Sequence, residues 1–220
     1  TVRIKITGMQ YVLSAPFVPG EESPSCLPTQ SETHIYRRGQ WKTLKLVLLT
    51  HIHCDHFQPS TLRLLASNRP TLRFACCDWL CKPLVDAGVP ISQIDVLTPG
   101  TMYGYGICNV IPNMVKHNVP NCGWKVWLPA GKLFYCTDMN NLNGIAAPNY
   151  DLYMVEANYE DEEIQAKIAE KKLTGEYIYE KRVLRDHMSV AKINDWLYAN
   201  MGSNSAYIYM HCHQDKEDAT

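Results

Sequence analysis

The segment from Leu44 to His56 reads LKLVLLTHIHCDH, and it decides the fold. Its first part, up to Leu49, is almost wholly apolar and has the length of a buried strand. Its last part gathers three imidazoles and one carboxylate within six residues, a density that packing does not require. Histidine is the commonest side-chain metal ligand, and a buried strand holds the ligands that follow it on a rigid support. The segment therefore predicts a metal-dependent hydrolase.

The composition is that of an ordinary globular protein of 220 residues, and we expect one domain over 1–220. Lys and Arg number 21 and Asp and Glu 22, so the chain lacks the strong positive charge typical of proteins that bind long nucleic acids. Nine cysteines without regular spacing indicate reduced thiols and a cytoplasmic protein. We see neither a secretory leader nor a membrane-spanning apolar run, and expect no membrane partner.

Strand and helix patterns alternate along the chain, which predicts a layered α/β architecture. We expect strands over 2–6, 33–36, 44–49, 72–75, 110–115, 125–128, 133–137, 152–156 and 206–210. We expect helices over 59–66, with Ser60 as N-cap, and over 78–87, 160–172 and 189–198. The Pro- and Ser-rich segment 15–32 predicts a long loop.

The spacing of the ligands in the 51–56 segment suits two metal ions. His51 and His53 end the strand, whereas Asp55 and His56 lie on the turn that follows. Consecutive residues point in different directions, so one ion does not easily take all four, and each pair is expected to bind its own.

Three further candidate ligands follow predicted strands elsewhere in the chain: His117, Asp138 and His211. Each is weak evidence alone, but together they are expected to converge on one edge of a sheet assembly. An Asp can bridge two cations, as in the metal pairs that hydrolyse phosphodiesters. His213 does not fit this set, and its role stays open.

The pattern His51-x-His53-x-Asp55-His56, followed by these three residues, resembles the metallo-β-lactamase superfamily. The resemblance runs from about residue 44 to 213 and implies an αβ/βα four-layer sandwich with two Zn²⁺ ions at its edge. By that analogy His51, His53 and His117 bind the first ion, Asp55, His56 and His211 bind the second, and Asp138 bridges them. The diiron, oxygen-reducing branch carries Glu at the position of His53, which disfavours that branch here.

Two further segments resemble the RNase Z-like phosphodiesterases within that superfamily. Residues 155–159, Val-Glu-Ala-Asn-Tyr, are similar to their Glu-Ala-Thr-Tyr/Phe element, with Asn158 in place of Thr. Residues 186–189, Asp-His-Met-Ser, are similar to their His-Ser-Thr element. The resemblance implies that Glu156 orients His187 and that His187 serves the scissile phosphate. We therefore assign Asp55, Glu156 and His187 as catalytic.

These residues favour a phosphodiesterase in which a hydroxide shared by two Zn²⁺ ions attacks phosphorus. The near-neutral charge favours a small cyclic nucleotide, as for the phage anti-Pycsar enzymes that the chain resembles. RNA or DNA cleavage of RNase Z type is the first alternative. Lactone or thioester hydrolysis and metal binding without catalysis are the others. By analogy with the family, we also expect the protein to form a homodimer.

Overall fold

The computed structural model describes residues 3–6 and 44–212 and divides into two compact units, with the boundary between Thr101 and Met102. The described residues contain five α-helices and ten strands, arranged in two sheets. Each sheet lies within one unit. The segment 7–43, with its expected loop at 15–32 and strand at 33–36, and His213 lie outside the described residues.

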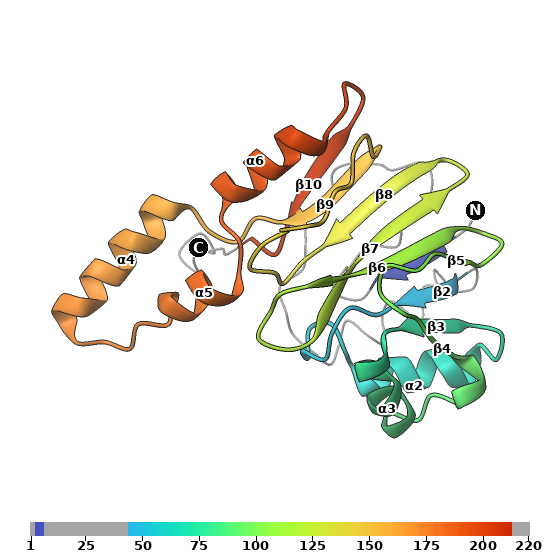
Figure 1. The fold of residues 1–220 in the computed structure, drawn as a ribbon. Helices are drawn as coiled ribbons and strands as arrows, with labels where there is room; N and C mark the ends of the chain where they lie inside the picture. Colours follow the sequence, from blue (N-terminus) through green and yellow to red (C-terminus); the bar gives the residue numbers. More distant parts are fainter. Residues whose placement is uncertain (1–2, 7–43, 213–220) are drawn as a thin grey trace, which may run out of the picture. The chain divides into compact units, whose positions relative to one another are not determined.

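The first unit contains a four-stranded parallel sheet in the order β1-β2-β3-β4. Its strands are β1 (Arg3–Ile6), β2 (Leu44–Leu48), β3 (Arg73–Cys76) and β4 (Ile94–Val96). The connections are α2 (Pro59–Asn68), α3 (Asp78–Asp86) and the short 3-10 helix η1 (Ile91–Gln93) (Figure 1). Parallel strands need such crossovers, because a tight hairpin reverses the chain.

The central strand β2 is buried at every position except Lys45, as its apolar sequence predicts. Both helices contribute leucines to the core around it, among them Leu62 and Leu84. The expected N-cap role of Ser60 is wrong: α2 begins at Pro59, and Gln58 is the N-cap residue. The reason is that proline has the φ of a first helical residue and no N–H to cap, so the N-cap lies two residues before Ser60.

The second unit contains a six-stranded sheet in the order β10-β9-β8-β7-β6-β5. Its strands are β5 (Tyr103–Gly104), β6 (Asn109–Val115), β7 (Asn121–Leu128), β8 (Gly131–Cys136), β9 (Leu152–Glu156) and β10 (Ala206–Met210). The strands β8, β9 and β10 are parallel, and the pairs β5–β6, β6–β7 and β7–β8 are antiparallel. It follows that β6, β8, β9 and β10 all point the same way and end at one edge of the sheet.

The helix α6 (Val190–Asn200) packs on this sheet (Figure 1). Ser189, expected as the first residue of this helix, is its N-cap and accepts a hydrogen bond from the Lys192 N–H. Its Trp196 ring stacks on the fully buried Phe134 of β8, with ring centroids 5.0 Å apart.

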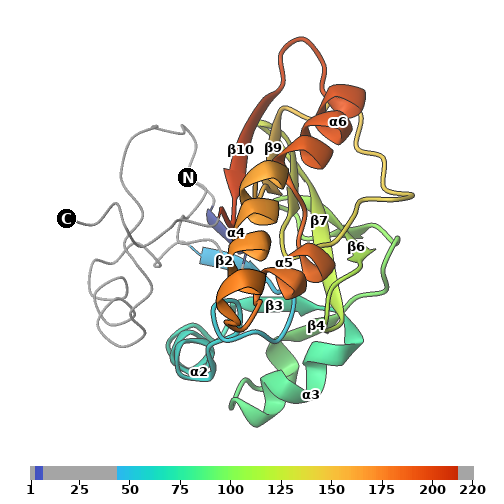
Figure 2. The ribbon, with the colours of Figure 1, turned by 90° about the vertical axis from the view of Figure 1, so that its left-hand side faces the viewer.

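Two charged helices, α4 (Asp161–Thr174) and α5 (Glu180–Asp186), lie between β9 and α6 along the chain. They lie side by side in both views (Figures 1 and 2) and share a small core that contains Ile164, Ile168 and Val183. The sequence pattern does not predict α5, which is short and mostly charged. No helix in the described part of the chain is long and apolar enough to cross a bilayer.

The Phe134–Trp196 contact gives a first prediction. Phe134→Ala removes a fully buried ring from the core of the second unit, so the free energy of unfolding should fall by about 3–5 kcal/mol. Tyr198→Ala is the control, because Tyr198 lies on the same helix as Trp196 but is 93% exposed; its effect should stay within about 0.5 kcal/mol. Urea unfolding followed by circular dichroism measures both. Similar small effects for the two variants would contradict the packing described here.

Candidate active site

In the first unit, the chain leaves β2 through Leu49 and Thr50 and turns sharply over residues 51–57. The backbone N–H groups of His56 and Phe57 both donate to the His53 carbonyl, at 2.9 and 2.7 Å. Phe57, the last residue of the turn, is buried in the hydrophobic core of the first unit and so holds the turn against that core. The four polar side chains of this turn are thereby held on a compact, hydrogen-bonded loop.

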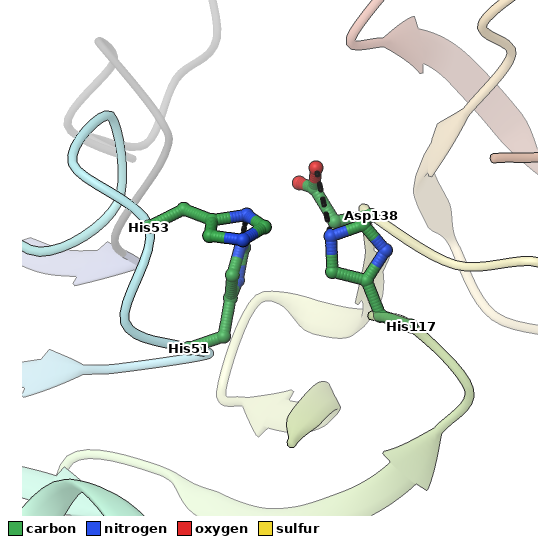
Figure 3. A group of neighbouring side chains, drawn as sticks. All are labelled: His51, His53, His117 and Asp138. Carbon is green, nitrogen blue, oxygen red and sulfur yellow. Dashed lines mark hydrogen bonds and ion pairs between the residues drawn. The ribbon is translucent and has the colours of Figure 1, made fainter. Parts of the chain in front are cut away.

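These side chains form two pairs of candidate ligand atoms. His51 Nε2 lies 3.2 Å from His53 Nδ1 (Figure 3), and Asp55 Oδ2 lies 3.3 Å from His56 Nε2. Two ligands of one tetrahedral ion at ~2.0–2.1 Å are separated by roughly 3.3 Å. Both separations fit that value, in the pairing expected from sequence.

Thr50, which sequence analysis did not single out, supports this loop. Its buried hydroxyl lies 3.0 Å from Nδ1 of His51 and 3.4 Å from Nδ1 of His56. A metal-binding histidine commonly has its other ring nitrogen hydrogen-bonded in this way, which fixes the ring orientation. One hydroxyl therefore orients a ring from each pair.

In the second unit, the shared edge of the sheet carries the other candidate residues. His117 follows β6, Asp138 follows β8, Glu156 is the last residue of β9, and His211 follows β10. Because these four strands end at the same edge, residues up to about ninety positions apart in sequence are brought together there. This is the convergence expected from sequence, within one unit.

Asp138 lies closest to the middle of this group. Its Oδ1 is 3.2 Å from His211 Nδ1. The same oxygen is 3.9 Å from His117 Nε2 (Figure 3). The Nδ1–H of His117 donates to the Asp186 carbonyl at 3.0 Å. That bond fixes the tautomer of His117 and leaves the Nε2 lone pair directed toward Asp138.

Both Asp138 and His211 have left-handed backbone conformations, each with φ of 54°. Such conformations are strained for residues other than glycine and persist where the surroundings hold them. The buried Asn121 amide donates to the Thr137 and Asp138 carbonyls at 3.0 and 2.7 Å. The Asn158 amide donates to the His211 carbonyl at 2.8 Å. Asn158 thus has a structural role at the position where it departs from the Glu-Ala-Thr-Tyr/Phe pattern.

Glu156 and His187 form the shortest polar contact of this site. The fully buried Glu156 carboxylate accepts from His187 Nδ1 at 2.5 Å through Oε1 and from the Met139 N–H at 2.7 Å through Oε2. His211 Nδ1 is 3.6 Å from the same Oε1. The His187 ring lies between two other imidazoles, with centroid distances of 5.3 Å to His117 and 5.1 Å to His211.

The spacing of the second unit's residues suits a divalent cation. Ligand atoms of Asp138, His187 and His211 all lie within 4.8 Å of one another. Sequence analysis assigned His187 to the phosphate and not to metal; the structure brings it beside the metal-ligand candidates, with Glu156 occupying its Nδ1. Imidazole and carboxylate are ligands that zinc and related divalent ions accept.

Two ionisable side chains near this site, Cys136 and Asp186, have shifted pKa values that fix their protonation states. Burial, together with the negative charges of Glu156 and Asp138, raises the pKa of the Cys136 thiol well above its usual value, which keeps the thiol neutral. The hydrogen bond from Arg185 holds the pKa of Asp186 below its usual range, with further contributions from positive charge nearby. Asp186 therefore stays ionised and paired with Arg185 while its carbonyl orients His117.

Comparisons with known proteins agree on the fold. No protein-family model matches the chain, and no curated protein matches it in sequence. The solved metallo-β-lactamase fold protein YhfI from Bacillus subtilis matches 84% of this chain and 72% of its own, with a TM-score of 0.61 and 14% identity.

Two more solved structures extend this likeness. The short form of human tRNase Z (ELAC1) matches 83% of this chain and 78% of its own, with a TM-score of 0.53 and 13% identity. The Zn²⁺-bound PqqB from Methylobacterium extorquens matches 77% of this chain and 62% of its own, with a TM-score of 0.51 and 12% identity. At such low identity the likeness establishes architecture alone: the chain is an α/β protein with the metallo-β-lactamase fold.

Proposed function

We propose that this protein is a divalent-metal-dependent phosphodiesterase that hydrolyses a small nucleotide, with a cyclic mononucleotide as the leading substrate. The observation that carries the proposal is the 2.5 Å contact between His187 and the buried Glu156, beside Asp138 and His211. A hydrolase that needed only metal ligands would have no use for this additional, carboxylate-held imidazole. The pair supplies what a phosphodiester demands: a positively charged donor for the leaving oxygen.

The proposed metal assignment is the one that the family resemblance implies. We propose that His51, His53 and His117 bind one ion, that Asp55, His56 and His211 bind a second, and that Asp138 binds both. The ligand-atom separations of 3.2 Å for His51–His53, 3.3 Å for Asp55–His56 and 3.2 Å for Asp138–His211 support this assignment. All the proposed ligand atoms are imidazole nitrogens or carboxylate oxygens, which favours zinc. When bound, the ions would supply an activated water and would neutralise charge on the phosphate.

In this proposal the roles of the chain's own residues follow from their contacts. Glu156 accepts the Nδ1 proton of His187, so that the Nε2 side of the ring faces the substrate. A proton on that Nε2 would be delivered to the departing alkoxide, and Glu156 would stabilise the charged imidazole before transfer. The Met139 N–H holds the other carboxylate oxygen, which keeps the pair in one orientation.

A nuclease is the second candidate, and it is supported by the likeness to human tRNase Z. The near balance of 21 basic and 22 acidic residues weighs against it, because a nucleic-acid backbone demands a basic surface. Lactone or thioester hydrolysis is the third candidate and is weighed lower because the segments of Glu156 and His187 resemble phosphodiesterase elements. A cytoplasmic location and a homodimer remain predictions.

The metal centre is tested by elemental analysis. We expect the purified protein to carry about two divalent ions per chain, with zinc preferred in competition. Asp138→Ala should lower that content, because one carboxylate serves both ions. Asp151→Ala, in which another carboxylate at the start of β9 is removed, is the control and should retain the metal. Absence of metal in the wild type, with no uptake of added zinc, would refute the centre.

The role of His187 is tested by turnover and metal content together. His187→Ala should keep its metal and lose about 10²–10⁴-fold in kcat, the usual contribution of a general acid or base. Glu156→Gln should lower kcat in the same direction but by less. Lys181→Ala, on the exposed side of α5, should change neither quantity. An unchanged rate for His187→Ala on every phosphodiester tried would remove the assignment, and loss of metal would make His187 a ligand instead.

The substrate class is tested by salt dependence. A cyclic mononucleotide carries one phosphate charge, so its KM should change little between low salt and ~150 mM, where surface charges are screened beyond ~8 Å. Binding to RNA engages many phosphates and weakens steeply with salt. We expect cyclic mononucleotides to be cleaved to linear monophosphates and structured RNA to be cleaved slowly at ~150 mM salt. Fast, salt-sensitive RNA cleavage with inert cyclic nucleotides would favour the nuclease.

A further inference from the structure

The loop between β8 and β9 contains the only Asn-Gly pair in the sequence, Asn143–Gly144. The pair forms the centre of a β-turn, in which the Ile145 N–H donates to the Leu142 carbonyl at 3.0 Å. Gly144 has φ of 78°, whereas the φ of Asn143 is not positive, and this combination identifies a type II turn. Both residues are exposed. The pair is therefore accessible to water at the tip of a tight turn.

The polar groups of this pair are largely unengaged within the described part of the chain. The Asn143 N–H donates to Asn141 Oδ1 at 3.1 Å. The side-chain amide of Asn143, its carbonyl and the Gly144 N–H have no hydrogen-bond partner among the described residues. A Cβ atom added to Gly144 would meet no atom within 4 Å. The Asn143 side chain can therefore turn toward the Gly144 nitrogen, and the peptide between the two residues can rotate, without losing a hydrogen bond of its own.

The two sides of this turn are fixed. Leu142 is buried and belongs to the core of the second unit. On the other side, the Ile145 carbonyl accepts a hydrogen bond from the Trp196 indole at 3.0 Å. A covalent change at the tip leaves these contacts in place, so we expect the chain to stay folded after it.

Other asparagines lack this combination of free groups. The side chains of Asn140 and Asn141 are hydrogen-bonded to each other, with Asn141 Nδ2 donating to Asn140 Oδ1 at 2.7 Å. Asn204 is exposed and precedes a small residue, but the N–H of that residue, Ser205, donates to a backbone carbonyl at 3.1 Å. Among these four asparagines, only Asn143 has both a free side-chain amide and a free N–H on the residue that follows.

We propose that Asn143 is a site of spontaneous deamidation, with water as the only co-reactant. The Gly144 nitrogen attacks Cγ of Asn143 and forms an N–Cγ bond, while the Cγ–Nδ2 bond breaks and Nδ2 leaves as ammonia with the proton from the Gly144 nitrogen. Glycine favours this step because it has no Cβ to obstruct the approach. Water then opens the cyclic imide at either carbonyl. Attack at Cγ gives an ordinary aspartate, and attack at the backbone carbonyl gives an isoaspartate, in which the main chain runs through the side-chain carbon.

Either product changes the charge of a loop that is connected to the site described above. It adds one negative charge to a formal net charge of −1. Three hydrogen bonds in series run from the Asn143 N–H through Asn141 and Asn140 to the Arg185 carbonyl. The next carbonyl along the chain accepts from His117. The modification therefore occurs at one end of a hydrogen-bonded network whose other end lies beside a proposed metal ligand.

Peptide mapping by mass spectrometry tests this proposal on the folded full chain. The protein is incubated in ¹⁸O-labelled water at mildly alkaline pH, where the Gly144 N–H proton is lost more easily, and is then digested in ordinary water. The peptide that contains Asn143 should gain about 3 Da, because ammonia leaves and one labelled water enters, and fragmentation should place the gain on Asn143. Asn143→Gln, which requires a larger ring, and Gly144→Ala, which adds a Cβ beside the attacking nitrogen, should each slow the gain about tenfold or more.

Asn204 provides the matched control, because it is exposed but is followed by an engaged N–H. Labelling at Asn143 should be at least about tenfold faster than at Asn204, and Asn204→Gln should leave the labelling of Asn143 unchanged. Faster labelling at Asn143 supports the proposal even if Gly144→Ala does not fold, since the wild type alone decides it. Labelling of the folded protein at Asn143 that is absent, or no faster than at Asn204, overturns the proposal, whether or not the chain unfolded in guanidinium takes up the label. The measurement needs no enzymatic activity, so its result is separate from the proposed function.

Discussion

A buried carboxylate organises the second unit. Glu156 is fully buried at the end of β9, and an ionised carboxylate in such a place must be hydrogen-bonded or paired. Its two oxygens contact the Met139 N–H, His187 and His211. These partners come from the turn after β8, the segment before α6 and the end of β10. The requirement to satisfy one side chain thus joins three distant parts of the chain at the place where the chemistry is proposed.

Asparagine amides then hold the neighbouring backbone in conformations that it would not adopt alone. Asp138 and His211 have positive φ, and strain of this kind costs about 1–3 kcal/mol per residue. Asn121 and Asn158 offset part of that cost through hydrogen bonds to the carbonyls of those same residues. The Asp and His side chains are directed toward each other as a result, which an extended strand end would not achieve.

The helices α4 and α5 lie between β9 and α6 along the chain. Their shared apolar core is small, and most of their surface is charged. Residues of both helices, and of the segments after β9 and β10, line a cavity of about 240 Å³. The proposed metal ligands follow strands or lie on the turn after β2, and none of them comes from these two helices.

The sequence by itself predicted most of the described strands, because buried strands are apolar, but it did not predict the short β4 and β5. The cluster of His51, His53, Asp55 and His56 within six residues carried the resemblance that implied the fold. It also indicated His117, Asp138 and His211 as candidates, since each follows a recognisable strand, and the resemblance to the RNase Z-like elements implied the Glu156–His187 contact that the structure contains. The supporting contacts of Thr50, Asn121 and Asp186 carried no such signal, because a lone polar residue looks the same whether it faces water or a histidine. The cavity under α4 and α5 was likewise decided by tertiary structure alone, since its walls come from segments up to about fifty residues apart and only their packing leaves the space between them.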